Sequence, residues 1–196
     1  MKYLYIICTF CFLNTTAIGQ EIWEVDYLHS NLRFEVGWQD FSMRTGEFKK
    51  FEGTITTASL EDLSDALIEF KVDAASVDVI ADRLAEHVMS KKFLNVEVYP
   101  EIKFTSNGLT PTSDSTYISN GTLEICGVEN TQEVSVWVKG YKETRKGNIF
   151  GIQVTMTVDR TAFGLDWGKP RLADKIKLVG HLLYKKQEEE EGESSK

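Results

Sequence analysis

The chain has 196 residues, 42% of them hydrophobic, and a formal net charge of −8. This length is enough for one domain with a full hydrophobic core. The acidic balance, without any basic stripe, argues against nucleic acid and anionic lipid surfaces as partners.

The first nineteen residues predict a secretory leader rather than part of the fold. Lys2 supplies a positive start, residues 3–13 form an apolar run, and Ala17-Ile18-Gly19 has the pattern of a cleavage site. The apolar run is too short for a membrane span, although an N-terminal anchor helix is the alternative. We expect a periplasmic or secreted protein that starts at Gln20 and does not span a membrane. Cys126 is then its only cysteine, so no internal disulfide can form.

Most of the mature chain alternates apolar and polar residues with a period of two, as half-buried strands do. Leu32, Phe34 and Val36 give the clearest example. After a short extended lead-in at 22–26, eight strands are predicted, at 31–37, 46–56, 67–77, 101–107, 116–126, 132–140, 149–159 and 175–184. The parity changes between Phe48 and Phe51, which predicts a bulge near Lys49-Lys50.

One stretch, 73–104, leaves this alternation and predicts a helix. Val79, Leu84 and Val88 recur at helical spacing. Tyr99-Pro100 ends the excursion, because the residue before a proline is pushed toward extended geometry. The helix is therefore expected between the third and fourth strands.

Eight antiparallel strands in an exported chain favour a closed barrel, because closure removes exposed edges. Two packed sheets are the alternative, and periodicity does not separate the two. A barrel of this size either holds one small ligand or is filled by its own side chains. The pattern alone slightly favours filling, because many large residues are expected on the inner face: Phe34, Phe48, Phe51, Phe70 and Phe104.

The last ten residues, 187–196, are Glu-rich and nearly without apolar side chains. They cannot bury surface to offset their ordering entropy and are expected to be disordered. The domain plan is thus a leader (1–19), a barrel domain (20–186) and an acidic tail (187–196).

No catalytic site, metal site or cofactor is predicted. His29, His87 and His181 are far apart and lack metal-ligand spacing, so each is interpreted as structural. Asp26, His29 and Ser30 lie close together, but a serine triad needs an exposed nucleophile on a sharp turn. A turn held by the Asp26 carboxylate and the Ser30 hydroxyl is favoured instead.

An ordered series of short motifs resembles the YceI-like polyisoprenoid-binding family over about residues 23–184. The series consists of Trp23-Glu24-Val25-Asp26 with His29-Ser30, Gly46-Glu47-Phe48, Phe51-Glu52-Gly53, Ala75-Ser76-Val77, the run 87–95, Tyr99-Pro100-Glu101-Ile102-Lys103-Phe104, Gly121-Thr122-Leu123, Gly127-Val128, and Asp159-Arg160 with Phe163-Gly164. Two departures are Leu94-Asn95, where the family has an aromatic residue and Asp, and Glu129-Asn130, where Thr-Lys is common.

The resemblance implies a lipocalin-like antiparallel barrel whose apolar cavity takes up a polyisoprenoid or similar amphipathic lipid. The residues expected to contact this ligand are Phe34, Phe48, Phe51, Phe70, Met89, Phe93, Phe104, Leu123, Val136, Val154, Arg160 and Leu178. Those expected to point inward, from the apolar parity of their strands, are Phe34, Phe70, Phe104, Leu123, Val136, Val154 and Leu178. For Arg160, contact with a polar head group and pairing with groups near Asp159 are both open.

The helical stretch is placed to cover one barrel mouth. Met89, Phe93 and Leu94 there either contact the ligand or only pack the helix onto the barrel. The leading hypothesis is non-catalytic binding, storage or transfer of a polyisoprenoid or quinone-like lipid. A stress-related structural or protein-binding module with a filled barrel is the alternative, and an enzyme acting on lipid amides or esters ranks third. Self-association into a homodimer is left open.

Overall fold

Twelve strands, one α-helix and three 3-10 turns form residues 19–187, the part of the chain that this computed structural model describes. The strands are β1 (Glu21–Val25), β2 (Asn31–Trp38), β3 (Ser42–Phe48), β4 (Phe51–Thr57), β5 (Leu67–Asp73), β6 (Val77–Val79), β7 (Glu101–Asn107), β8 (Thr110–Pro111), β9 (Thr116–Ile125), β10 (Val128–Thr144), β11 (Gly147–Asp159) and β12 (Leu172–Lys186). The helix is α1 (Asp82–Met89), and the 3-10 turns are η1 (Tyr27–His29), η2 (Ala74–Ser76) and η3 (Arg160–Phe163).

The predicted leader, except Gly19, and the acidic tail, except Gln187, lie outside the described residues. Cleavage after Gly19 and disorder of the tail therefore stay predictions. The backbone N–H of Gln187 donates to the carbonyl of Ile22 (2.8 Å), so the paired structure extends one residue past the predicted barrel boundary. Within residues 19–187 no helix has the length and apolar character needed to cross a membrane.

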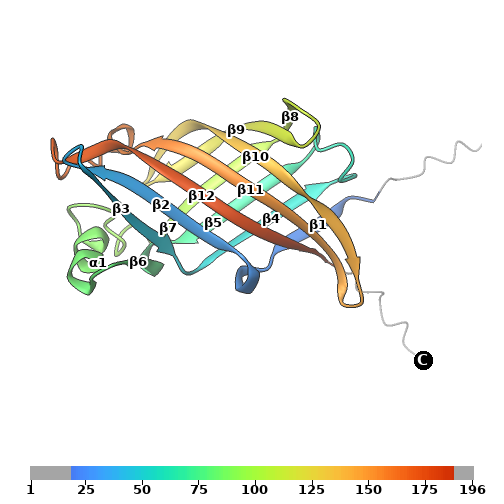
Figure 1. The fold of residues 1–196 in the computed structure, drawn as a ribbon, viewed down its shortest axis with the longest axis horizontal. Coiled ribbons are helices and arrows are strands. Elements are labelled where there is room, and N and C mark those ends of the chain that lie inside the picture. Colours follow the sequence, from blue (N-terminus) through green and yellow to red (C-terminus); the bar gives the residue numbers. More distant parts are fainter. Residues whose placement is uncertain (1–18, 188–196) are drawn as a thin grey trace, which may run out of the picture.

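Antiparallel pairing closes the sheet into a barrel. The closed ring contains eight strands, β1-β4-β5-β7-β9-β10-β11-β12, and β12 pairs back with β1. Strands β2, β3 and β6 extend the sheet beyond β12, and β8 pairs with β9. The β2–β3 turn, β6 and α1 gather at one end of the barrel, and the β10–β11 turn lies at the other (Figure 1). The predicted eight-stranded closed barrel is confirmed over two packed sheets.

The position of the helix differs from the prediction, because several predicted strands are divided. The predicted strand 46–56 is β3 and β4, which part at Lys49-Lys50 and pair with different neighbours, so this point is a corner. The predicted strand 67–77 is β5, η2 and the start of β6. The Ser76 hydroxyl accepts the Lys50 N–H (3.0 Å) and the Asp73 carboxylate accepts the Ala75 N–H (2.9 Å). These bonds satisfy backbone groups that have no partner in the sheet. Because the predicted strands are divided in this way, α1 follows β6 in the structure and not the third strand.

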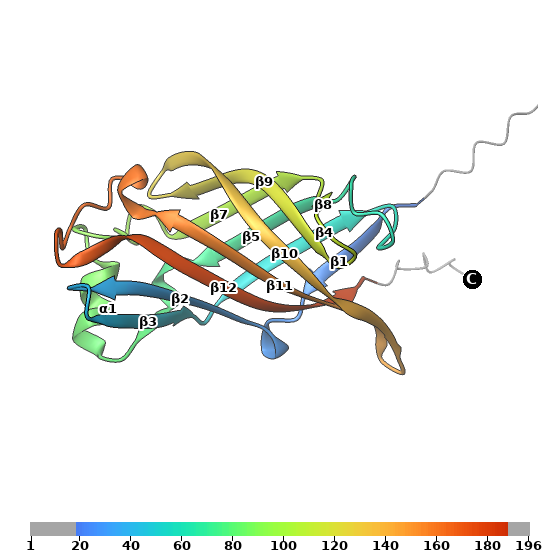
Figure 2. The same ribbon diagram turned by 45° about the horizontal axis from the view of Figure 1, so that its top comes forward.

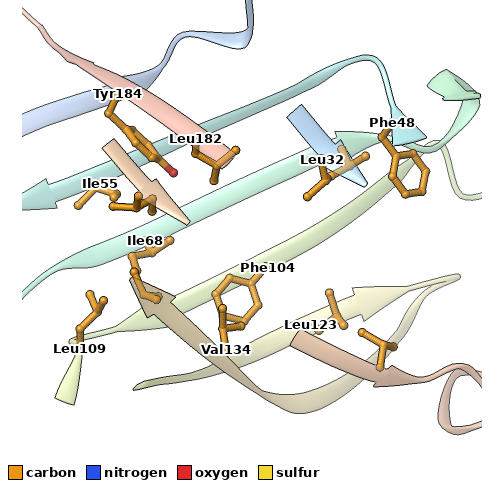
Figure 3. Packing of buried hydrophobic residues seen from close by; sticks show 14 of the residues in the cluster. Leu32, Phe48, Ile55, Ile68, Phe104, Leu109, Leu123, Val134, Leu182 and Tyr184 are labelled. Atoms are coloured by element: carbon orange, nitrogen blue, oxygen red, sulfur yellow. The ribbon is translucent and has the colours of Figure 1, made fainter. Parts of the chain in front are cut away.

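Apolar side chains from opposite walls point into the barrel (Figure 3). At the end near the β10–β11 turn, Trp23, Phe150 and Tyr184 are at most 2% exposed. Their rings pack edge-on or tilted, with centroids 6.0 Å apart for Trp23 and Phe150 and 6.5 Å apart for Phe150 and Tyr184. Because these rings are almost inaccessible, they close this end of the barrel.

The turn between β1 and β2 is held as predicted. The Asp26 carboxylate accepts the Leu28 N–H (3.2 Å), pairs with the His29 ring (2.7 Å) and lies 2.7 Å from the Lys185 ammonium. The Ser30 hydroxyl donates to the Asp26 carbonyl (2.7 Å). Both Asp26 and Ser30 are thus used in the corner between the two strands.

This corner predicts a pH dependence of stability. Burial of Asp26 raises its pKa, but bonds from Lys185 and His29 outweigh burial and hold the pKa below its ordinary value of 3.8. A carboxyl with a lowered folded pKa stabilises the fold above its unfolded pKa, and this contribution is lost as the pH falls through the folded value. We expect Asp26→Asn to cost about 1 kcal/mol at pH 7 and to flatten the loss of stability below pH 3.8. Urea unfolding at several pH values measures both effects, and an unchanged acid limb would contradict them.

Candidate functional site

The barrel contains an apolar cavity of about 260 Å³. Ten of the twelve predicted ligand-contacting residues line it: Phe34, Phe48, Phe70, Phe93, Phe104, Leu123, Val136, Val154, Arg160 and Leu178. All seven residues predicted to point inward are among them, so the strand register read from the apolar alternation is confirmed.

Phe51 and Met89 do not line the cavity. The Phe51 ring stacks on Phe70, with ring centroids 5.7 Å apart and planes at 24°. It belongs to the corner between β3 and β4, where it supports Phe70. Met89, the last residue of α1, is partly buried and packs against the core cluster. Of the mouth residues named from the sequence, Phe93 and Leu94 line the cavity.

The cavity stays unfilled although large aromatic side chains line it, because several of their rings lie over glycines of the barrel wall. A Cβ atom at any of these glycines would come within 3.0 Å of the facing ring. The pairs are Phe34 over Gly46, Phe70 over Gly53 and Phe104 over Gly121. The glycines therefore let the rings pack against the wall instead of crossing the interior.

The cavity opens at the α1 end, which we call the mouth. Trp167 lines the cavity and is 42% exposed, and Trp38, Arg44 and His87 line it while half-buried. At the opposite end Tyr184 is 1% exposed. The cavity is thus a tube with one accessible end.

Two nitrogens at the mouth lack hydrogen bonds. The Arg44 guanidinium carbon lies 4.2 Å from the centroid of the Trp38 ring, and the His87 ring lies 4.0 Å from that of Trp167. Arg44 Nε and His87 Nε2 are buried, and no group among residues 19–187 bonds to either. A buried polar atom without a partner is costly, so this pair is suited to a ligand that brings oxygen atoms.

The sequence predicts a barrel mouth covered by the helical stretch, but it does not single out the polar residues of that mouth. His87 is interpreted as structural from the sequence, and Arg44, Trp38 and Trp167 are not among the predicted ligand contacts. No periodic pattern marks these residues, because the open end of the barrel is formed by loops that come together only in the folded chain. The nearest signal is that Trp38 and Arg44 both lie in the short segment 38–45 between two predicted strands.

Of the two roles left open for Arg160, the geometry favours the structural one. Its side chain is 0% exposed, and its guanidinium makes five hydrogen bonds. They reach the carbonyls of Ala173 (2.9 Å), Leu165, Trp167 (2.9 Å) and Leu172 (2.9 Å) and the carboxylate of Asp174 (3.3 Å). A guanidinium has five N–H donors, so none is left for a head group. Arg160 instead holds the loop between η3 and β12, which carries Trp167.

Two further features of the described residues concern metal binding and thiol reactivity. In the described range, no three His, Cys, Asp or Glu side chains gather as a metal site. The Cys126 thiol is half-buried and donates to the carbonyl of Leu94 (3.2 Å), and burial raises its pKa. Cys126 therefore stays a packed thiol at neutral pH.

Residues 23–182 match the family model of the YceI-like domain. The chain belongs to this family. This YceI-like chain is 29% identical over 139 residues to the UPF0312 protein of Pseudomonas savastanoi, covering 70% of this chain and 71% of that protein. It is 27% identical over 126 residues to Protein YceI of Salmonella newport, covering 63% and 64% of the two chains.

Solved structures share the fold. BcnA of Burkholderia cenocepacia superimposes with a TM-score of 0.73 at 23% identity, covering 81% of this chain and 98% of that one. A polyisoprenoid binding domain from Saccharophagus degradans gives a TM-score of 0.67 at 14% identity, covering 84% and 98% of the two chains. At these identities the comparison supports the barrel architecture alone.

Proposed function

We propose that this YceI-like protein binds the long apolar chain of an amphipathic lipid, a polyisoprenoid or a quinone-like lipid, without catalysing a reaction on it. One observation carries the proposal: the barrel holds an unfilled apolar cavity that is closed at one end and polar at its mouth. A cavity maintained by rings that lie over glycines argues against a structural module filled by its own side chains. The polyisoprenoid binding domain with the same fold supports this ligand class.

The energetics favour a long chain over a small molecule. Each buried CH₂ group contributes about 0.8 kcal/mol, whereas association costs about 4–15 kcal/mol. Roughly four buried isoprene units therefore reach about micromolar affinity without strong polar contacts. One or two units do not reach that affinity.

In the proposed complex the chain lies along the cavity and the head group lies at Arg44 and His87. An oxygen-rich head group supplies acceptors for the Arg44 guanidinium and hydroxyl or carbonyl partners for Nε2 of His87. Phe93 and Leu94, which follow α1 and line the cavity, contact the first part of the chain. We also propose that the protein works in the periplasm or the medium, which rests on the leader pattern.

The ligand is tested by native mass spectrometry of the protein exported from its own host, followed by organic extraction. We expect a bound lipid with a long isoprenoid chain that is released by extraction. Delipidated protein should take up the same lipid from detergent with micromolar or tighter affinity. Protein that carries no lipid and takes none up would refute the proposal.

The head-group contact is tested with Arg44→Met and His87→Leu. Each change removes one polar partner, and we expect each to weaken binding of the extracted lipid by about 10- to 100-fold. Binding of a hydrocarbon chain without a head group should change little. Arg145→Met in the turn between β10 and β11, at the far end of the barrel, is the matched control. Equal losses for lipid and hydrocarbon would contradict head-group recognition.

A further inference from the structure

Large apolar side chains stay exposed around the cavity mouth. Phe41 and Ile80 are each 94% exposed, Met43 is 59% exposed and Trp167 is 42% exposed. We call these four residues the apolar rim. They come from separate places in the chain: the β2–β3 turn and the start of β3, the segment between β6 and α1, and the loop between η3 and β12. Single exposed apolar residues are ordinary, but a contiguous set indicates an interaction surface.

Direct contacts join the segments that carry the rim. The Gln39 N–H donates to the Arg171 carbonyl (2.7 Å), which ties the β2–β3 turn to the loop of Trp167. Trp167 packs on His87 of α1. In both views the β2–β3 turn, α1 and the loop before β12 lie together at the same end of the barrel (Figures 1 and 2).

The rim continues into the cavity. Trp167 belongs to both, since it is exposed on one side and lines the cavity on the other. The Phe41 N–H donates to the carbonyl of Trp38, which also lines the cavity (3.2 Å). Ile80 directly follows Val79, another lining residue that pairs with Gly46 of β3. Each of these rim residues is therefore part of, bonded to or next in the chain to a residue that lines the cavity.

The charges at this end of the barrel nearly balance. The segments 38–44, 78–83 and 165–174 hold five acidic and four basic side chains. Some of these charges are paired on the protein, since the Lys169 ammonium lies 2.8 Å from Asp166 and 3.8 Å from Asp174. A nearly neutral, apolar end matches a zwitterionic lipid surface.

We propose that the apolar rim docks onto the surface of a zwitterionic phospholipid bilayer. Phe41, Met43, Ile80 and Trp167 enter the interfacial region, where aromatic and aliphatic side chains are stable. The mouth then faces the bilayer, and a ligand chain passes between bilayer and cavity without crossing water. The transfer of a ligand during docking rests on the proposed lipid-binding function, but docking itself can be measured without the ligand.

The test uses the exported protein and vesicles of pure phosphatidylcholine that contain no isoprenoid. Co-flotation of wild type is compared with the double variant Phe41→Ser/Ile80→Ser. Both side chains are almost fully exposed, so the fold is expected to be unchanged. We expect wild type to float with the vesicles and the double variant to lose roughly tenfold or more in partitioning. Added salt should have little effect, and anionic vesicles should bind less than zwitterionic ones.

The matched control is Tyr27→Ser/Leu28→Ser in η1. These two side chains are also exposed, at 58% and 74%. They belong to η1, the blue turn between β1 and β2, which lies away from α1 and the mouth (Figure 1). We expect this control to float as wild type does. Wild type that does not float, or equal losses for both double variants, would overturn the docking proposal.

Two further readouts separate the remaining outcomes. Sedimentation of the free protein shows whether the rim instead pairs two copies: a dimer that Phe41→Ser/Ile80→Ser dissociates, without vesicle binding, would overturn the bilayer as the partner. Uptake of detergent-dispersed lipid should be equal in wild type and the rim variant, whereas transfer from vesicles should be slower in the variant. Rim-dependent flotation by a protein that takes up no lipid would refute the proposed function and leave docking standing.

Discussion

We expect Val154→Trp to abolish lipid retention while leaving the barrel folded. Val154 points inward from β11 and is only half-buried, because it faces the open cavity. An indole ring there takes the space of several methylene groups of the ligand. Loss of about six buried methylenes costs roughly 5 kcal/mol of binding free energy, a loss of more than a thousandfold in affinity. Native mass spectrometry and a titration with the extracted lipid measure the effect.

The control for this prediction is Thr157→Trp on the same strand. Thr157 is exposed and alternates with the inward residues of β11, so an indole there stays outside the barrel. Its affinity should equal that of wild type. If Val154→Trp binds the lipid as tightly as wild type, the ligand does not lie in this cavity.

The largest loss of stability is expected from Arg160→Met. This change leaves the carbonyls of Leu165, Trp167, Leu172 and Ala173 without the guanidinium that now bonds to them. Each buried carbonyl left without a partner costs about 1–3 kcal/mol, so we expect a loss of several kcal/mol. Denaturant unfolding should show this loss, with the midpoint shifted to lower urea.

Two variants separate charge from geometry at this position. Arg160→Lys keeps the charge but not the fork of five donors, so it should lose most of the same stability. Asp174→Asn, at a half-exposed carboxylate 3.3 Å from the guanidinium, should lose less than about 1 kcal/mol. An Arg160→Met protein with wild-type stability would show that the loop is held by other contacts.

The barrel wall could be predicted from the sequence because the polarity of each wall residue indicates whether its side chain points inward or outward. Phe104 and Leu123 alternate with polar neighbours on their strands, and burial of one face is enough to produce that alternation. The corners could not be predicted in this way. The Lys50–Ser76 bond that divides two predicted strands joins residues 26 positions apart. Alternation along one strand carries no information about such a contact.

The mouth shows the same limit. Arg44 and His87 are candidates for ligand binding because Nε of Arg44 and Nε2 of His87 are buried without a hydrogen-bond partner among the described residues. That lack depends on the surrounding fold and cannot be read from the sequence. Whether the barrel is filled or hollow also depends on which residues face each other on neighbouring strands. A list of inward phenylalanines predicts filling, whereas Phe70 opposite Gly53 in the β4–β5 register permits a cavity.

The closed end formed by Trp23, Phe150 and Tyr184 has a consequence for selectivity. A tube with one opening has a fixed depth, so its cargo enters tail first and leaves head first. A chain shorter than the tube leaves wall uncovered, and a longer chain leaves methylene groups in water. Affinity should rise with each added unit until the tail reaches the aromatic floor and then level off. The barrel would thereby select lipids by chain length, with the limit set by the Tyr184 ring, which lines the cavity, and by the Phe150 and Trp23 rings packed behind it.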